Sequence, residues 1–150
     1  MKNHEDYMKI ALSLAKEAGE NGEIPVGAIV VVKGEIVAQG RNEKEMRGDA
    51  TAHAEILVLQ RAAKKVGHWR LSDATMYVTL EPCSMCAGAM VQARLGNLVF
   101  GAYDPRAGAA GSVVDLLDHP AFNHRVIVKS GVLAEESGQI LKEFFDSKRR

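Results

Sequence analysis

Apolar and polar residues follow one another along the chain with a period that changes from helical to extended and back. Between residues 8 and 18 the apolar positions recur every three or four residues, which predicts an amphipathic helix over residues 4–20. Residues 26–32 are rich in β-branched side chains, and a second short run at residues 36–39 follows a Lys-Gly-Glu turn. Two such runs around a glycine turn predict a β-hairpin.

The rest of the chain alternates helical and extended patterns, which predicts a mostly parallel sheet with helices on both faces. The leading hairpin makes that sheet mixed. We therefore expect one α/β domain over residues 1–150, a three-layer α/β/α fold with a central five-stranded mixed sheet. After the hairpin the expected elements are a charged loop at 41–50, a helix that is capped by Thr51 and runs to about Val66, a strand from Ala74 to Leu80, a helix from Pro82 to Arg94, a strand from Leu98 to Ala102, a glycine-rich loop at 103–112, a strand from Arg125 to Lys129 and a helix from Leu133 to Ser147.

The composition is that of an ordinary globular protein, with 47% hydrophobic and 25% charged residues in 150. The first residues carry mixed charge without an apolar run, which argues against a secretory signal. No stretch approaches the ~18 apolar residues of a membrane span. Two closely spaced cysteines in such a chain favour metal or redox work over a disulfide. We expect a reducing, cytoplasmic setting and no membrane partner.

Charge is balanced overall but unevenly spread. Formal net charge is zero, yet the first 60 residues hold more acidic than basic side chains and the remainder shows the reverse. The chain ends in Lys148-Arg149-Arg150. A polyanion could bind such a basic end, although a solvated chain end is the ordinary explanation of the same charges.

The chemistry concentrates in two short segments, His53-Ala54-Glu55 and Pro82-Cys83-Ser84-Met85-Cys86. An imidazole and two thiolates make a ligand set for one zinc ion, and three protein ligands leave the fourth tetrahedral position for water. That arrangement is typical of catalytic rather than structural zinc. Glu55 remains free to move protons. This H-x-E…P-C-x-x-C pattern is the known signature of zinc-dependent nucleobase deaminases.

The predicted elements explain why these residues can meet. Cys83 and Cys86 are three residues apart on a first helical turn, where free N–H groups and the helix dipole favour thiolates. The 26 residues from Ile56 to Glu81 have room for one helix and one strand, which returns the chain to the same end of the sheet. His53 and Glu55 differ by about 200° around a regular helix. The site is therefore expected across a helix end.

Each part of the motif has a commoner explanation when it stands alone. A C-x-x-C pair is most often redox-active or half of a structural zinc site. A lone buried histidine is usually a hydrogen-bonded core residue, and H-x-E triplets occur by chance. The combination at this spacing is what indicates a catalytic zinc.

The chain resembles the cytidine deaminase superfamily and, within it, the bacterial tRNA-specific adenosine deaminases, over nearly its whole length. The resemblance implies that His53, Cys83 and Cys86 hold one zinc per subunit and that Glu55 shuttles protons. It also implies conversion of adenosine to inosine at the wobble position, with a tRNA anticodon stem-loop as substrate and a homodimer as the working form. The matching segments are Ile24–Ala28, Thr51–Ile56, Tyr77–Met90, Asp104–Ser112 and His119–Val126. The nucleoside pocket would be lined by Asn42, Ile24, Val26 and Ala54.

An anticodon loop offers unpaired bases, so contacts to stacked bases and phosphates are expected. A stacking platform and phosphate contacts would come from Phe144, Phe145, Lys148 and Arg149, with Asp104, Arg106 and Arg70 on flanking loops. Phe144 also fits an apolar stripe with Leu133, Ile140 and Leu141, as in an ordinary core helix. Pro105-Arg106-Ala107 departs from the small and basic residues expected in that loop, and the tail after Phe145 is short.

Two other functions use the same zinc motif. A deaminase of a free guanine, cytosine or nucleoside shares it entirely, and only the loop at 104–112 and the basic end favour RNA. A zinc-stabilised RNA-binding module without catalysis would not need the unliganded carboxylate of Glu55.

Overall fold

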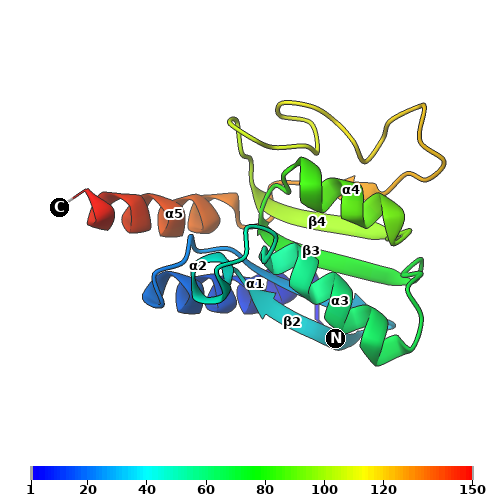
Figure 1. Ribbon diagram of the computed structural model, residues 1–150, viewed down its shortest axis with the longest axis horizontal. Helices are drawn as coiled ribbons and strands as arrows, with labels where there is room; N and C mark the ends of the chain where they lie inside the picture. The colour runs from blue at the N-terminus through cyan, green and yellow to red at the C-terminus, as the bar shows by residue number, and fades with distance from the viewer. Residues whose placement is uncertain (1, 150) are drawn as a thin grey trace.

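A five-stranded mixed sheet forms the middle layer of the protein (Figure 1), in a computed structural model that describes residues 2–149. The strands lie in the order β2-β1-β3-β4-β5. Strand β1 is antiparallel to β2 and β3, while β3, β4 and β5 are parallel. The predicted mixed sheet is confirmed. The strand bounds are β1 Gly27–Val32, β2 Glu35–Arg41, β3 Ala74–Leu80, β4 Asn97–Ala102 and β5 Ile127–Lys129.

Helices cover both faces of the sheet, as the alternation of strand residues requires. Ala28 and Val30 of β1 point into the core beneath α3 and α4, whereas Ile29 and Val31 point to α1 on the opposite face. Helix α5 packs beside α1 and against β4. The helix bounds are α1 His4–Glu20, α2 Lys44–Arg47, α3 Ala54–Val66, α4 Ser84–Gln92 and α5 Ala134–Lys148.

The predicted start of two helices and the character of one loop were wrong. The N-cap of α3 is His53 rather than Thr51, and α4 begins at Ser84 rather than Pro82, because His53 and Cys83 have extended backbone as N-cap residues. The predicted charged loop at 41–50 contains the short helix α2.

Helix α2 depends on a contact from outside its own segment. Its first residues donate backbone N–H groups to the Glu23 carboxylate, from Glu45 at 2.9 Å and Met46 at 2.8 Å. Since Glu23 lies 22 residues upstream of Glu45, no local sequence pattern could have predicted α2. Among residues 2–149, no helix combines the length and apolar character needed to cross a membrane.

The parallel arrangement of β3 and β4 sets the position of the site. Leu80 pairs with Ala102, so both strands end at one edge of the sheet. The N–H of Glu81 donates to the carbonyl of Ala102 at 2.9 Å, which holds the C-terminal ends of β3 and β4 together. The cysteine segment follows β3 and the glycine-rich loop follows β4, at the carboxyl edge where open α/β sheets bind ligands.

Candidate metal centre

Three ligand atoms converge where two helices begin. Nδ1 of His53 lies 3.7 Å from Sγ of Cys83 and 3.5 Å from Sγ of Cys86. All three atoms lie within 4.8 Å of one another. His53 and Cys83 are the N-cap residues of α3 and α4, and neither makes a side-chain cap hydrogen bond. Both side chains are therefore free to face the site instead of closing their own helices.

These distances fit a zinc ion. Tetrahedral zinc, with Zn–S about 2.3 Å and Zn–N about 2.0–2.1 Å, would hold its nitrogen and sulfur ligands about 3.6 Å apart. The two observed separations fall on either side of that value. Three ligands leave one tetrahedral position for water, and the described part of the chain offers no fourth histidine, cysteine or carboxylate in the cluster. The predicted zinc site is consistent with this geometry.

The electrostatics of the cluster favour a cation. A hydrogen bond from Cys86 and the neighbouring His53 lower the pKa of Cys83 to about 3. The hydrogen bond to Cys83, together with burial, raises the pKa of Cys86. The hydrogen bond with Cys83 raises the pKa of His53. One thiol is thus already a thiolate, and a bound dication would stabilise the second.

Glu55 lies in the second position of α3 and is 4% exposed. Burial raises the pKa of its carboxyl group to about 7, and the charges of Cys83 and His53 act on it as neighbours. The carboxyl group therefore lies beside the cluster. Because His53 has extended backbone, the 200° separation of two residues within a regular helix does not apply to His53 and Glu55.

Asn42 joins three segments at the start of α3. Its Oδ1 accepts the backbone N–H of Ala54 at 3.0 Å, and its Nδ2 donates to the carbonyl of Ile24 at 3.0 Å. Its own backbone N–H donates to the carbonyl of Val26 at 3.1 Å. Val26 and Ala54 are buried, while Ile24 is 42% exposed. The four residues predicted to line the pocket are thus neighbours, and Ile24 is the one among them with a largely exposed side chain.

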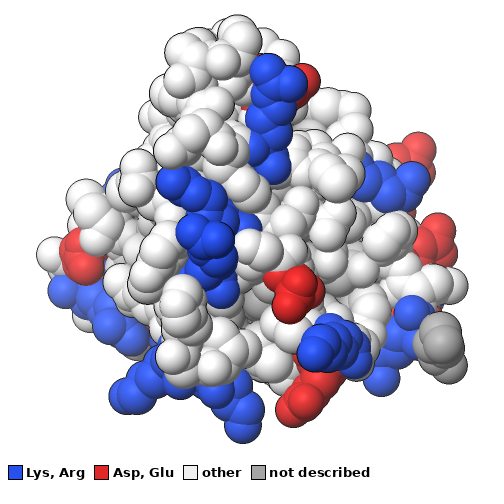
Figure 2. All heavy atoms as spheres, turned by 90° about the vertical axis from the view of Figure 1, so that its right-hand side faces the viewer, with Lys and Arg blue, Asp and Glu red and all other residues white. Residues whose placement is uncertain are grey.

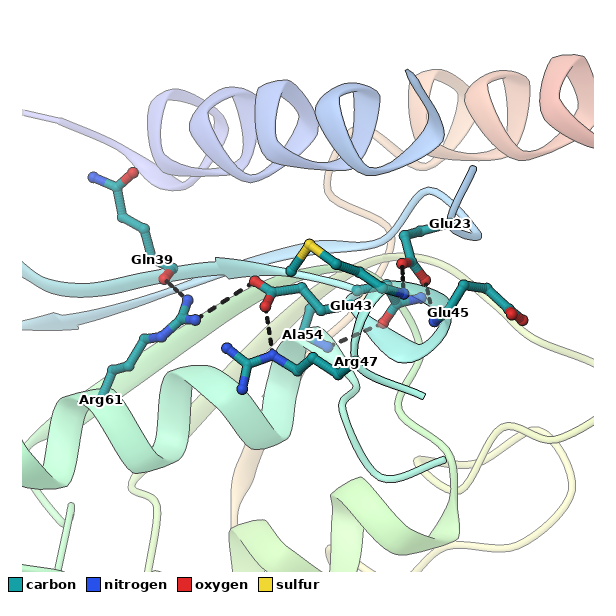
Figure 3. Close-up of polar contacts among 9 residues, drawn as sticks. Glu23, Gln39, Glu43, Glu45, Arg47, Ala54 and Arg61 are labelled. Carbon is teal, nitrogen blue, oxygen red and sulfur yellow. Dashed lines mark hydrogen bonds and ion pairs between the residues drawn. The ribbon is translucent and has the colours of Figure 1, made fainter. Parts of the chain in front are cut away.

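Two further buried carboxylates hold this corner of the molecule (Figure 3). Glu43 pairs with Arg47 at 2.6 Å and with Arg61 of α3 at 3.5 Å. Burial alone would raise the pKa of Glu43, but the two guanidinium groups outweigh it and hold that pKa below its ordinary value. Together with Glu23, which holds α2, these contacts fix the segment around Asn42 against α3.

The cleft beside Asn42 brings together residues that lie far apart in sequence. Its volume is about 550 Å³, and its lining includes Ile24, Asn42, Phe144 and Lys148. Nζ of Lys148 lies 5.4 Å from the centre of the Phe144 ring. Phe145 is 40% exposed. Arg149 is exposed, and Arg150 lies outside the described residues.

Arg70 is the predicted site residue that the fold leaves far away. It follows the C-terminus of α3, whereas His53 caps the N-terminus, a separation of about 20 Å along a 13-residue helix. Its guanidinium lies 5.4 Å from the centre of the Trp69 ring. Figure 2 shows this end of the molecule, where Lys and Arg side chains are separated by uncharged surface. They do not form one continuous basic patch on that face.

Sequence reasoning did not single out Glu81. This buried residue accepts hydrogen bonds from the loop that contains Asp104 and Arg106. Burial would raise its pKa, but hydrogen bonds from Ser112, Asp104 and Ala110 outweigh it and lower the pKa. A glutamate just after a buried strand and before the cysteine motif was the available signal. Glu23 and Glu43 offered none, since their partners are distant.

Comparison with known proteins identifies the family. Residues 2–149 match the MafB19-like deaminases. The chain is 50% identical to the tRNA-specific adenosine deaminase of Bacillus subtilis (strain 168), over 100% of this chain and 93% of that protein. A structure from a study of A-to-I editing by tRNA:A34 deaminases gives a TM-score of 0.87 at 44% identity, covering 90% of this chain and 98% of that chain.

A second solved structure shares the fold but is less similar. The guanine deaminase from Bacillus subtilis gives a TM-score of 0.67 at 33% identity, covering 99% of this chain and 96% of that chain. The resemblance drawn from the motifs is confirmed: the chain belongs to the MafB19-like deaminase family, with a cytidine deaminase-like fold.

Proposed function

We propose that this protein is a zinc-dependent hydrolase that converts adenosine to inosine at the wobble position of a tRNA anticodon. The observation that supports the reaction is the cluster of His53, Cys83 and Cys86 with the buried carboxyl of Glu55 beside it. The support for the substrate is full-length similarity to a tRNA-specific adenosine deaminase. We take residues 1–150 as a single catalytic domain.

In this proposal His53, Cys83 and Cys86 would hold one zinc ion, which when bound would lower the pKa of a water to ~7. Glu55 accepts the proton that this water loses and delivers it to N1 of adenine, which makes C6 electrophilic. The water oxygen adds to C6, and Glu55 then moves the remaining proton of that oxygen to the amino group. The C6–N bond breaks, ammonia leaves and C6 becomes the carbonyl carbon of inosine. A carboxyl group with a pKa of about 7 suits both accepting and donating a proton.

The nucleoside would enter beside the helix end that Asn42 holds. Ile24 and Asn42 line the cleft, and Val26 and Ala54 form its buried support. Phe144, Phe145, Lys148 and Arg149 on or next to α5 would contact neighbouring bases and phosphates. Arg106 and Asp104 would act from the loop after β4. Arg70 would contact only a more distant part of the tRNA.

The test is inosine formation in a synthetic anticodon stem-loop by the zinc-loaded protein. Glu55→Gln should keep one zinc per chain while turnover falls by about 10²–10⁴, the usual contribution of a general acid–base group. Undiminished turnover in this variant would refute the role of Glu55. Zinc binding without inosine in any tRNA would refute the deaminase proposal.

Deamination of a free base is the second candidate, because the guanine deaminase from Bacillus subtilis shares the fold. Ammonia release from guanine, without inosine in RNA, would favour it.

We further propose a homodimer in the cytoplasm, where tRNA is found and where two free cysteines stay reduced. An apolar cleft between α3 and α4, beside the 53%-exposed Trp69, supports the dimer. Sedimentation measurements would test it.

A further inference from the structure

Glu81 is a buried carboxylate that the proposed chemistry does not use. It is 2% exposed and lies two residues before Cys83. Within residues 2–149, no lysine, arginine or histidine forms an ion pair with it. A buried charge requires other compensation. Here all of its hydrogen-bond donors come from one loop, residues 104–112.

The donors approach both carboxylate oxygens. Oε1 accepts the backbone N–H of Asp104 at 3.0 Å and the hydroxyl of Ser112. Oε2 accepts the backbone N–H groups of Ala110 and Ser112, each at 3.0 Å. Because the donors come from both ends of the loop, the loop closes around a single side chain.

Packing fixes the same loop against the cysteine segment. The N–H of Ala109 donates to the carbonyl of Pro82 at 2.8 Å, next to the metal ligand Cys83. Gly108 lies so close that a Cβ there would be 2.3 Å from Cδ of Glu81. Gly108 and Ala109 are buried, while Pro105, Arg106 and Ala107 are exposed. The loop thus has a fixed base and an exposed tip at the carboxyl edge of the sheet.

We propose that Glu81 is a positioning residue that holds the loop 104–112 in one conformation, so that its tip at Pro105-Arg106-Ala107 is preformed for the phosphates of RNA beside the target nucleotide. The identity of this ligand rests on the proposed function. A preformed loop need not be ordered during binding, which strengthens affinity without new contacts. Substrate affinity, rather than the chemical step, is therefore the property that Glu81 controls.

The test compares Glu81→Gln with Glu35→Gln, which removes the same charge from an exposed residue at the hairpin turn. Charge removal alone would tighten RNA binding. If Glu81 holds the loop in place, RNA binding should instead weaken. KM for an anticodon stem-loop should then rise about tenfold in Glu81→Gln, equivalent to about 1.4 kcal/mol. We expect kcat and zinc content to stay near wild type. Amide exchange of the loop should become at least about tenfold faster, with α3 unchanged.

If amide hydrogen exchange of the loop 104–112 stays slow in Glu81→Gln, the proposal that Glu81 holds the loop is overturned. If exchange becomes faster but KM is unchanged or lower, the proposed effect of the loop conformation on RNA affinity is overturned. If the wild-type protein neither binds nor deaminates the stem-loop, the proposed function is overturned instead. Amide exchange of the loop then tests by itself whether Glu81 holds the loop. If Glu81→Gln does not fold, Ser112→Ala removes one donor from an exposed residue, and unchanged exchange and KM in that variant overturn the proposal.

Discussion

Helix α3 lacks the cap that its own sequence would ordinarily supply, and Asn42 provides it from another segment. The N-cap residue is His53, whose Nδ1 faces the two sulfur atoms and makes no cap hydrogen bond. The first N–H groups of a helix have no partners inside the helix. Asn42 accepts one of them, from Ala54, and donates to Ile24. Asn42→Ala should therefore destabilise the fold as well as alter the pocket.

The magnitude follows from these two hydrogen bonds. Each contributes about 1 kcal/mol net, and loss of a helix cap typically costs ~1 kcal/mol. We expect Asn42→Ala to lower the free energy of unfolding by about 2 kcal/mol. For a chain of this size that corresponds to a melting temperature lower by about 4–8 °C. Asn42→Asp keeps the acceptor for Ala54 and loses only the donor to Ile24, so about half of that loss is expected.

Thermal unfolding of the zinc-loaded proteins, followed by circular dichroism, measures this effect. Turnover on a stem-loop, measured below the transition, shows whether the pocket has changed as well. Equal melting temperatures for wild type and Asn42→Ala would refute the cap. If turnover were lost in that case, Asn42 would serve the substrate alone. A larger loss in the Asp than in the Ala variant would show that the acceptor contributes nothing.

Four further substitutions probe the remaining contacts. Glu43→Gln should cost about 1–2 kcal/mol at pH 7, less than a fully buried pair because both arginines are partly exposed. The folded-state pKa of Glu43 is lowered, so the difference in free energy of unfolding between wild type and this variant is largest above the ordinary pKa of 4.5. The difference should shrink as pH falls through the folded-state pKa. Urea unfolding at several pH values measures it. Cys86→Ser should lower zinc content, measured by elemental analysis, and full occupancy would contradict its role as a ligand. Gly27→Ala should lower the melting temperature, because a Cβ there would lie 2.1 Å from the carbonyl oxygen of Ala11 in α1 and overpacking costs about 1–3 kcal/mol. Gly138→Ala, in open space on α5, should raise it through about 0.5–1 kcal/mol of helix propensity, and a common sign for the two glycine variants would refute the packing argument.

The sequence predicted the fold well because the strands that build it are locally consistent. The β-branched run of β1 and the alternating elements after it specify a sheet with two covered faces, and β3 has the predicted bounds, Ala74–Leu80. The zinc motif was equally readable, since His53 and the cysteine pair each follow a recognisable break in pattern. What failed was the start of α3 and α4. Pattern rules favour threonine and proline there, yet the predicted metal ligands His53 and Cys83 occupy the N-cap positions.

Tertiary contacts explain the other misses. The short helix α2 exists because Glu23 accepts its first N–H groups, and its sequence alone reads as a charged loop. Asn42 came only from the resemblance, which gave it a place in the pocket but not its bond to Ala54. Arg70 was predicted on a flanking loop, and this loop follows the C-terminus of α3, at the opposite end of the helix from His53.

The buried glutamates around the site show why one of them is suited to carry protons. Several donors from another segment stabilise the carboxylate of Glu81, and two arginines stabilise that of Glu43, so both pKa values are lowered. Glu55 is buried, and burial together with the charge of Cys83 raises its pKa to about 7. All are glutamates in the sequence, but at Glu81 and Glu43 the partners outweigh burial, whereas at Glu55 burial and the charge of Cys83 prevail. A carboxylate held by many donors is a structural anion, whereas one buried with few can exchange a proton near neutral pH. Glu55 is therefore distinguished from the others by a burial that its partners do not outweigh.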